Sequence, residues 1–242
     1  ALLDEPWASS LAEELAWMAR ELGAIRDTEV LLERLDRHAD DLGGDDGALA
    51  RSVIDPRLRQ RLASSRSGAL GALRSDRHEW LLDDLVAAAT MPMLGDLASM
   101  SCTRALPPLI DQTWRSLEVS IIRLTLYGSS EDWHRARIKA KRARYAVEAV
   151  APSFGKAAGR FAGALAGLTE ALGEHQDAVV AQEMIRELSD GPGIESRRVF
   201  ALGRLHAYEA EREFDARRAV FAEWSTVVWR AKRSGLVRRA GR

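Results

Sequence analysis

One short segment of this sequence carries a row of side chains that could bind an anion. Residues 134–148 read HRARIKAKRARYAVE. On a helix of 3.6 residues per turn, spacings of 3, 4, 3 and 4 gather five polar side chains on one narrow face: His134, Arg137, Lys141, Arg144 and Glu148. The opposite face carries small apolar residues that suit packing, namely Ala136, Ala140, Ala143 and Val147. We call His134, Arg137, Lys141 and Arg144 the basic row.

Like charges three and four residues apart repel one another and destabilise a helix, so the basic row needs an explanation. An anionic ligand lying along the row provides one. Arginine offers a bidentate fork for phosphate oxygens, and lysine offers a mobile point charge. Successive members of the row rise by about 5–6 Å, which suits an extended anion better than a single phosphate. His134 could donate a hydrogen bond to such an anion and would gain charge as a phosphate approached.

Other interpretations of the basic row stay open at this point. The row could be a solvated face paired with carboxylates of neighbouring helices, or the contact surface of a helical protein–protein adaptor for an acidic protein. His134 could accept a phosphoryl group in a phosphotransfer bundle, with the cations steadying that group. Specific nucleic-acid binding is disfavoured, because apart from Tyr145 the segment lacks base-reading polar residues and stacking aromatics.

Composition indicates a soluble, globular protein and excludes several classes of function. The 242 residues contain no run of about 18 apolar residues, so no membrane span is expected. Cys102 is the only cysteine, which excludes a disulfide framework and a cysteine-based metal site, favours a reducing cytoplasm and suggests a small buried side chain. No nucleotide-binding, nucleophile or metal motif is present, so we expect neither an enzyme, a metal nor a cofactor.

The net charge of −1 conceals an asymmetry between the two halves of the chain. Residues 1–120 hold 13 basic and 21 acidic residues, a net charge of −8. Residues 121–242 hold 22 basic and 15 acidic residues, a net charge of +7. A chain that is neutral overall can therefore still bind an anion through the cations gathered in its second half.

Helix formers dominate the sequence, and no alternating strand pattern appears. A capping box at Ser10 and Glu13 predicts the start of a first helix, and Gly23 predicts its end. The remaining helices are expected at about 26–42, 56–72, 75–90, 107–126, 131–150, 156–173, 175–189 and 195–230, with a loop at 43–47. The fold class expected is therefore all-α.

An internal repeat organises these helices. Residues 15–35 and 165–185 align at an offset of 150 and share the pattern Leu-Gly-x-x-x-Asp. We therefore expect an incomplete first repeat in 1–100 and a helical bundle formed by the second repeat in 101–242, together making one domain. The counterpart of the basic helix would lie before Ala1, so the first repeat is expected to lack its first helix.

The run from His134 to Glu148, together with LGAIRDTEV (22–30) and LGEHQDAVV (172–180), resembles the CHAD domain, the conserved histidine α-helical domain. The resemblance covers nearly the whole chain. It implies two antiparallel four-helix bundles with pseudo-twofold symmetry, the first here lacking its first helix. It also implies binding of inorganic polyphosphate in a basic cavity, without catalysis by the domain.

Matched residue by residue, the resemblance assigns polyphosphate binding to the basic row, to Arg142 and to Arg26 beside the first repeat's Asp27. Members of the family are found on polyphosphate granules or fused behind a triphosphatase-like domain. Granules and such a domain are thus candidates for this chain's location and partner. A missing first helix would also leave an apolar groove, through which we expect a partner helix or a dimer to pack.

Overall fold

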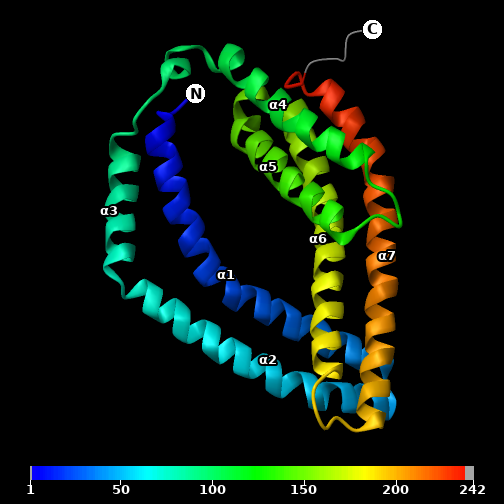
Figure 1. Cartoon of the computed structure of the whole chain (residues 1–242). Helices are drawn as coiled ribbons and strands as arrows, with labels where there is room; N and C mark the ends of the chain where they lie inside the picture. The colour runs from blue at the N-terminus through cyan, green and yellow to red at the C-terminus, as the bar shows by residue number, and fades with distance from the viewer. Residues whose placement is uncertain (1, 238–242) are drawn as a thin grey trace. The chain divides into compact units, whose positions relative to one another are not determined.

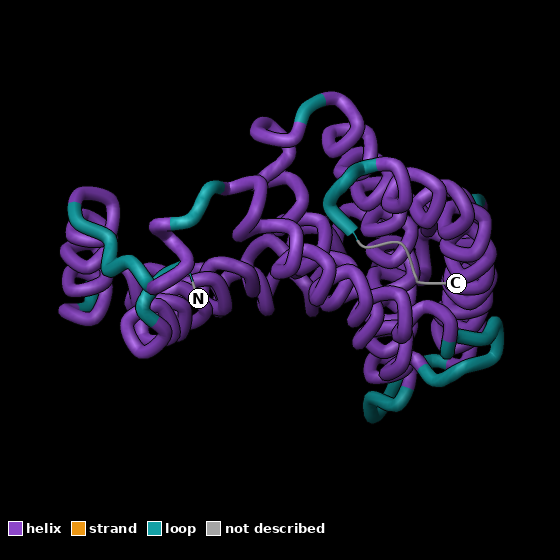
Figure 2. The backbone as a smooth tube through the Cα atoms, turned by 90° about the horizontal axis from the view of Figure 1, so that it is seen from above, coloured by secondary structure: helices purple, strands orange, loops and turns teal. Residues whose placement is uncertain are grey.

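The computed structural model describes residues 2–237, and nearly all of this part of the chain is helical (Figures 1 and 2). Seven α-helices and one 3-10 turn follow one another: α1 (Glu5–Leu42), α2 (Gly44–Leu73), α3 (Asp76–Thr90), η1 (Asp96–Ser99), α4 (Cys102–Ile122), α5 (Ser130–Phe154), α6 (Lys156–Ser189) and α7 (Ser196–Arg233). Between residues 2 and 237 the backbone forms no strand beyond one isolated bridge, Leu3 to Leu94. The all-α prediction is confirmed.

The chain divides into two compact units. Unit 1 comprises Ala1–Ser99 and Met184–His206, and unit 2 comprises Met100–Glu183 and Ala207–Arg242. The divisions near 184 and 207 fall inside α6 and α7, so the ends of these two helices that meet at residues 190–195 belong to unit 1.

Unit 2 is built around one continuous apolar core to which α4, α5, α6 and α7 all contribute. Trp114 of α4 stacks on Trp224 of α7 with ring centroids 5.3 Å apart, and meets the edge of Phe161 of α6 at 5.5 Å. Large aromatic rings in such offset and edge-on pairs supply much of a core's apolar burial. This core holds α5 in place, and with it the basic row.

Unit 1 is built mainly on the packing of α1 against α2, with lighter contacts from α3 to both helices (Figure 1). Leu35 of α1 and Leu58 of α2 are fully buried. Around them lie ion pairs at the surface, such as Arg77 of α3 with Glu14 of α1 at 2.6 Å. No helix within residues 2–237 combines the length and the apolar character needed to cross a membrane.

Two helix ends predicted from glycine are wrong. The helix α1 continues through Gly23, and α6 continues through Gly173 without interruption. A glycine inside a helix costs only about 1 kcal/mol, which the packing of helices this long offsets easily. As a result, Asp27 and Asp177, the aspartates of the shared pattern, lie within helices.

The true ends of α1 come from other residues. Asp4 caps its start, where the carboxylate accepts a hydrogen bond from the amide of Trp7 at 3.1 Å, so the helix begins before Ser10. Its end is Gly43, whose φ of 65° suits glycine, and α2 begins at once at Gly44. The predicted loop at 43–47 is therefore wrong: only Gly43 separates the two helices.

The start of α4 and the environment of Cys102 also differ from expectation. The helix begins at Cys102, five residues before the predicted start at Pro107. Pro107 and Pro108 thus lie inside the helix, where each removes one backbone hydrogen bond to the carbonyl four residues before it. Cys102 is exposed in this first turn, so the prediction of a buried side chain is wrong.

Candidate functional site

The helix that carries the basic row has well-defined ends. Ser129 is its N-cap, and the hydroxyl oxygen accepts a hydrogen bond from the amide of Asp132 at 3.2 Å. Glu131 and Asp132 place negative charge in the first turn, where the helix dipole favours it. Gly155, with φ of 78°, ends the helix. The segment predicted from residue spacing is therefore helical throughout.

The buried face of α5 fixes the direction of the basic row. Ala136, Ala140, Ala143 and Val147 are all at most 1% exposed, as predicted, and belong to the core of unit 2. Alanine allows α5 to approach its neighbours closely. At about 100° per residue, the basic row lies roughly 100° around the helix from this buried face. The basic row therefore lies beside the buried face of α5, at the border between the core and the surface.

His134 stands at the N-terminal end of the row and is held by α6. Its Nδ1 lies 2.8 Å from Oε1 of Gln176. With the amide oxygen as acceptor, Nδ1 carries the proton in a neutral ring, and Nε2 becomes a second donor when the ring is protonated. His134 is exposed, so an anion can reach this second nitrogen.

Arg137 lies across the helical glycine of the second repeat. Nη1 of Arg137 would lie 3.2 Å from a Cβ atom placed on Gly173, closer than most real Cβ contacts. The absence of a side chain at Gly173 thus gives the guanidinium room to lie over α6. Gly23, the equivalent residue of the first repeat, has nothing within 4 Å of such a Cβ. The shared glycine therefore serves the arginine in one copy only.

The members of the row differ in how far their charge is already compensated. Nε of Arg144 donates to Glu148 at 2.6 Å and its Nη1 donates to Thr169 at 3.0 Å, and the Glu148 carboxylate raises the pKa of Arg144. Within residues 2–237, neither Arg137 nor Lys141 forms a hydrogen bond or ion pair with another side chain. These two cations, one turn apart, remain available to an external anion.

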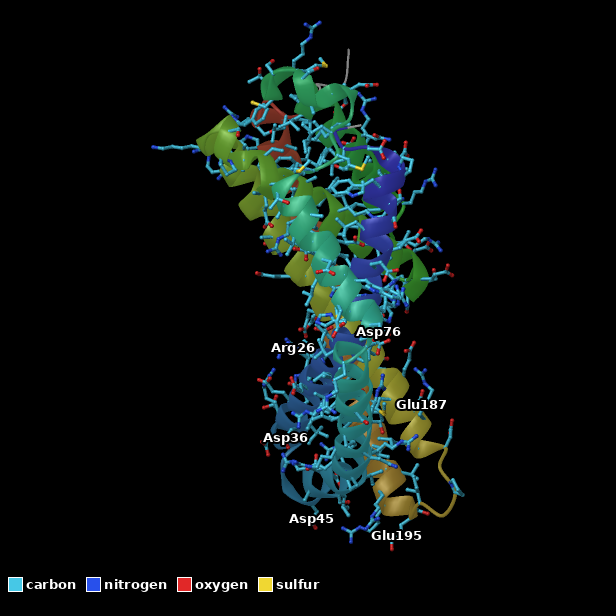
Figure 3. All side chains as sticks on the ribbon, turned by 90° about the vertical axis from the view of Figure 1, so that its left-hand side faces the viewer. Arg26, Asp36, Asp45, Asp76, Glu187 and Glu195 are labelled. Carbon is cyan, nitrogen blue, oxygen red and sulfur yellow. The ribbon has the colours of Figure 1, made fainter. Side chains whose placement is uncertain are left out.

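Two further residues assigned to the ligand by resemblance lie elsewhere. Arg142 lies about 120° around α5 from the centre of the row and lines a pocket between α4 and α5 together with Lys139. Arg26 belongs to α1 in unit 1, where Figure 3 labels it, and is exposed. The row itself therefore consists of His134, Arg137, Lys141 and Arg144, as its spacing predicted.

Beneath His134 lies a buried aromatic and charged cluster that sequence reasoning missed. Trp133 of α5 stacks on His175 of α6 with ring centroids 4.9 Å apart and an interplanar angle of 23°. His175 is 1% exposed, and its Nε2 lies 3.4 Å from Oε1 of Glu213 on α7. Trp133 and His175, which directly precede His134 and Gln176 in the sequence, are therefore both fixed in the core.

Glu213 is the charged centre of this cluster. Contacts with His175, Gln182 and Arg217 lower the pKa of Glu213 from 4.5 to about 2, against the opposing effect of burial. Nη1 of Arg217 also donates to the carbonyl of Leu126 at 2.6 Å, in the loop before α5. The cluster therefore joins the start of α5 to both α6 and α7. Its only signal in the sequence is a histidine that continues the apolar face of Leu168 and Leu172.

Comparison with known proteins places this architecture in a family. The family model described as CHAD domain matches residues 1–186. The uncharacterized proteins MT2285 and Rv2226 of Mycobacterium tuberculosis are each 29% identical to this chain over 215 residues. That alignment covers 82% of this chain and 38% of each relative, so the chain spans well under half the length of these relatives.

Two solved structures resemble the chain. PptA from Streptomyces chartreusis superposes with a TM-score of 0.81 at 26% identity, covering 93% of this chain and 82% of PptA. The CHAD domain from the plant Ricinus communis superposes with a TM-score of 0.65 at 27% identity, covering 89% of this chain and 72% of that domain. The resemblance seen in the sequence is thereby confirmed at the level of family and fold.

Proposed function

Because the chain belongs to the CHAD domain family, we propose that it binds inorganic polyphosphate through the basic row of α5 and catalyses no reaction itself. The observation that carries this proposal is the uncompensated charge of Arg137 and Lys141. The chain has 36 acidic residues for 35 basic ones, and many of its other arginines are paired with carboxylates. What sets Arg137 and Lys141 apart is that they lie unpaired between His134 and Arg144 on one face of a helix anchored in the core of unit 2, an arrangement that a bound anion would explain.

The shape of the row supports a chain-like anion. From His134 to Arg144 the row extends over about 15 Å at 1.5 Å per residue, which exceeds the reach of one phosphate. Arg137 can bind two phosphate oxygens at once, and Lys141 can follow the chain as a mobile charge. Arg144 would join them by exchanging Glu148 for the ligand. A linear polymer of phosphates matches this run of donors.

A titration of the purified chain tests the proposal. Long-chain polyphosphate, orthophosphate and single-stranded DNA would be compared by isothermal titration calorimetry at one fixed salt concentration. We expect binding of polyphosphate that is at least about 100-fold tighter than binding of orthophosphate, because several charge-assisted contacts act together. Equal affinity for all three anions would contradict the proposal.

A charge-reversal pair identifies the site. Changing Arg137→Glu and Lys141→Glu should abolish binding, whereas changing Arg57→Glu and Arg61→Glu should leave it unchanged. The control pair has the same spacing and net charge change, and both of its arginines are exposed on α2 in unit 1. Circular dichroism would verify that both variants remain helical. Equal losses in the two variants would mean that only the overall charge matters.

A phosphotransfer role is the second candidate, since His134 is exposed beside two uncompensated cations. In that role Nε2 would attack the phosphorus of a phosphodonor, the donor's leaving group would depart, and the ring's proton would pass to solvent. Acid-labile phosphate on His134 after incubation with acetyl phosphate would support this role. A third role, as an adaptor for an acidic protein, predicts that the affinity for polyphosphate does not change with its chain length. Affinity that rises with chain length would favour polyphosphate binding instead.

The location and partners follow as parts of the proposal. We propose a cytoplasmic chain associated with polyphosphate granules, and a triphosphatase-like domain as a fused or separate partner. The chain spans only 38% of the length of its curated relatives, which leaves room in those relatives for further domains. The apolar residues exposed on α1 and α3, such as Leu15 and Trp80, are the surface on which we propose that a partner helix or a second copy packs.

A further inference from the structure

A polar groove runs between α4 and α5 on the flank of α5 that faces away from the basic row. Two pockets form it, with volumes of about 320 and about 100 Å³. Lys139 lines both pockets, so they adjoin at this residue. We call these two pockets the α4–α5 groove, and six of its polar side chains could bind a ligand: Gln112, Ser116, Ser120, Arg123, Lys139 and Arg142.

The α4 wall of the groove is a continuous stripe of hydrogen-bonding side chains. Gln112, Ser116, Ser120 and Arg123 recur at spacings of 4, 4 and 3, which keeps them on one face of the helix. From Gln112 to Arg123 the stripe is about 16 Å long. The hydroxyls of Ser116 and Ser120 take part in no hydrogen bond within residues 2–237, so both can donate to a ligand.

The charge of the groove is positive and mostly uncompensated. Arg123, Lys139 and Arg142 form no ion pair with any side chain in the described part of the chain. Arg135 and Asp132 also line the smaller pocket, but they are paired with each other, so the carboxylate adds little net repulsion for an anion. Three cations and two hydroxyls therefore converge on one groove.

The α4–α5 groove is separate from the basic row. Its cations on α5 lie about 150° around the helix from the row at 100° per residue. The buried alanine face lies between them on one side, and the exposed apolar side chains of Ile138 and Tyr145 lie between them on the other. An anion held in the groove would therefore not contact Arg137 or Lys141.

We infer that the α4–α5 groove is a second binding site for linear phosphate chains. The class of ligand rests on the proposed function, whereas the position and the residues of the groove come from the structure alone. Serine hydroxyls and arginine and lysine side chains are the groups that donate to phosphate oxygens. The length of the stripe suits several consecutive phosphates. The chain would then be bivalent, and one long polyphosphate could bridge two copies of it.

Calorimetry with tripolyphosphate, which is too short to occupy both sites, tests this inference through stoichiometry. The whole chain should bind two molecules. Changing Lys139→Glu and Arg142→Glu should leave one, and changing Arg137→Glu and Lys141→Glu should also leave one. All four changes together should leave none. The pair Arg57→Glu and Arg61→Glu serves again as the control and should retain two.

The outcomes separate the two proposals. If the variant altered at Lys139 and Arg142 still binds two molecules, the α4–α5 groove is not a binding site, even if the basic row behaves as proposed. Loss of one molecule in that variant alone, with no change when Arg137 and Lys141 are altered, would support the groove and contradict the row. A second variant, Ser116→Asp with Ser120→Asp, tests the α4 wall without touching α5. It should also lose one molecule, and retention of both would count against the groove.

Discussion

The two copies of the repeat, 15–35 on α1 and 165–185 on α6, differ in how far their leucines are buried. Leu165 and Leu172 of α6 are fully buried in the core of unit 2, to which α5 contributes. Their equivalents on α1, Leu15 and Leu22, are 43% and 44% exposed. Similar sequences thus give a buried platform in one copy and an open apolar face in the other. The comparison teaches that α5 both completes the core over its copy of the repeat and carries the basic row.

The two units also use ion pairs differently. In unit 2, Glu213 and Arg217 lie largely buried and organise the loop before α5. In unit 1, pairs such as Arg77 with Glu14 lie at the surface, and acidic side chains such as Asp36 and Asp45 line its exterior (Figure 3). Exposed pairs of this kind contribute little to stability. Substitutions made at matched positions should therefore have unequal effects.

The largest difference is expected for the paired leucines. Changing Leu165→Ala should lower the free energy of unfolding by about 3–4 kcal/mol, because it leaves a cavity in a closed core. Changing Leu15→Ala should cost less than about 1 kcal/mol, because that side chain is already partly solvated. Urea denaturation measures both. Similar losses at the two positions would show that α1 is covered in solution.

Acid sensitivity should come next in size. The lowered pKa of Glu213 stabilises the fold above the unfolded value of 4.5, and this stabilisation is lost as the pH falls from about 5 towards 2. It should amount to at most about 3 kcal/mol. The Glu213→Gln variant should lose this part of the pH dependence, whereas Glu14→Gln in unit 1 should change the curve little. Identical curves for wild type and Glu213→Gln would contradict the assignment.

A smaller effect is expected at Gln176, which holds His134. Changing Gln176→Leu should weaken polyphosphate binding about fivefold, because the imidazole loses the partner that orients it. The Gln176→Asn variant keeps the amide group on a shorter side chain. Its affinity for polyphosphate should lie between those of the wild type and of Gln176→Leu. A changed pH profile of binding would show that the effect acts through His134. An unchanged affinity and profile in Gln176→Leu would exclude the positioning role.

The smallest effect concerns Arg26, the first repeat's counterpart of Gln176. Changing Arg26→Gln gives both copies the same residue and should weaken polyphosphate binding two- to threefold, the loss of one exposed contact. Changing Arg20→Gln, an exposed arginine earlier on α1, provides the control. No difference between the two variants would remove Arg26 from the binding residues.

Much of the fold could be predicted from the sequence, but the helix ends could not. Helix formers and the absence of a strand pattern predicted an all-α chain, which the structure confirms. Gly23 and Gly173 were expected to end helices, yet both lie within long helices whose packing outweighs the cost of glycine. The actual ends depend on caps such as Asp4 and on the positive φ of Gly43.

The basic row could be predicted because its members lie on one helix, where spacing alone fixes their common face. The residues that support it could not be predicted. Gln176 contacts His134 and Glu213 contacts His175, and both pairs are far apart in the sequence and meet only after folding. Arg142 shows a signal that was present but not used. Its angular position on α5 already separates it from the row, and only the packing of α4 shows what it lines.

The salt dependence of polyphosphate binding tests the central claim most directly. Each phosphate contact releases counterions, so the logarithm of the affinity should fall linearly with the logarithm of the salt concentration. Changing Arg137→Gln and Lys141→Gln should make that slope shallower by roughly 1.4, because two contacts are lost without charge reversal. If the variant keeps the slope and affinity of the wild type, polyphosphate does not bind along the basic row.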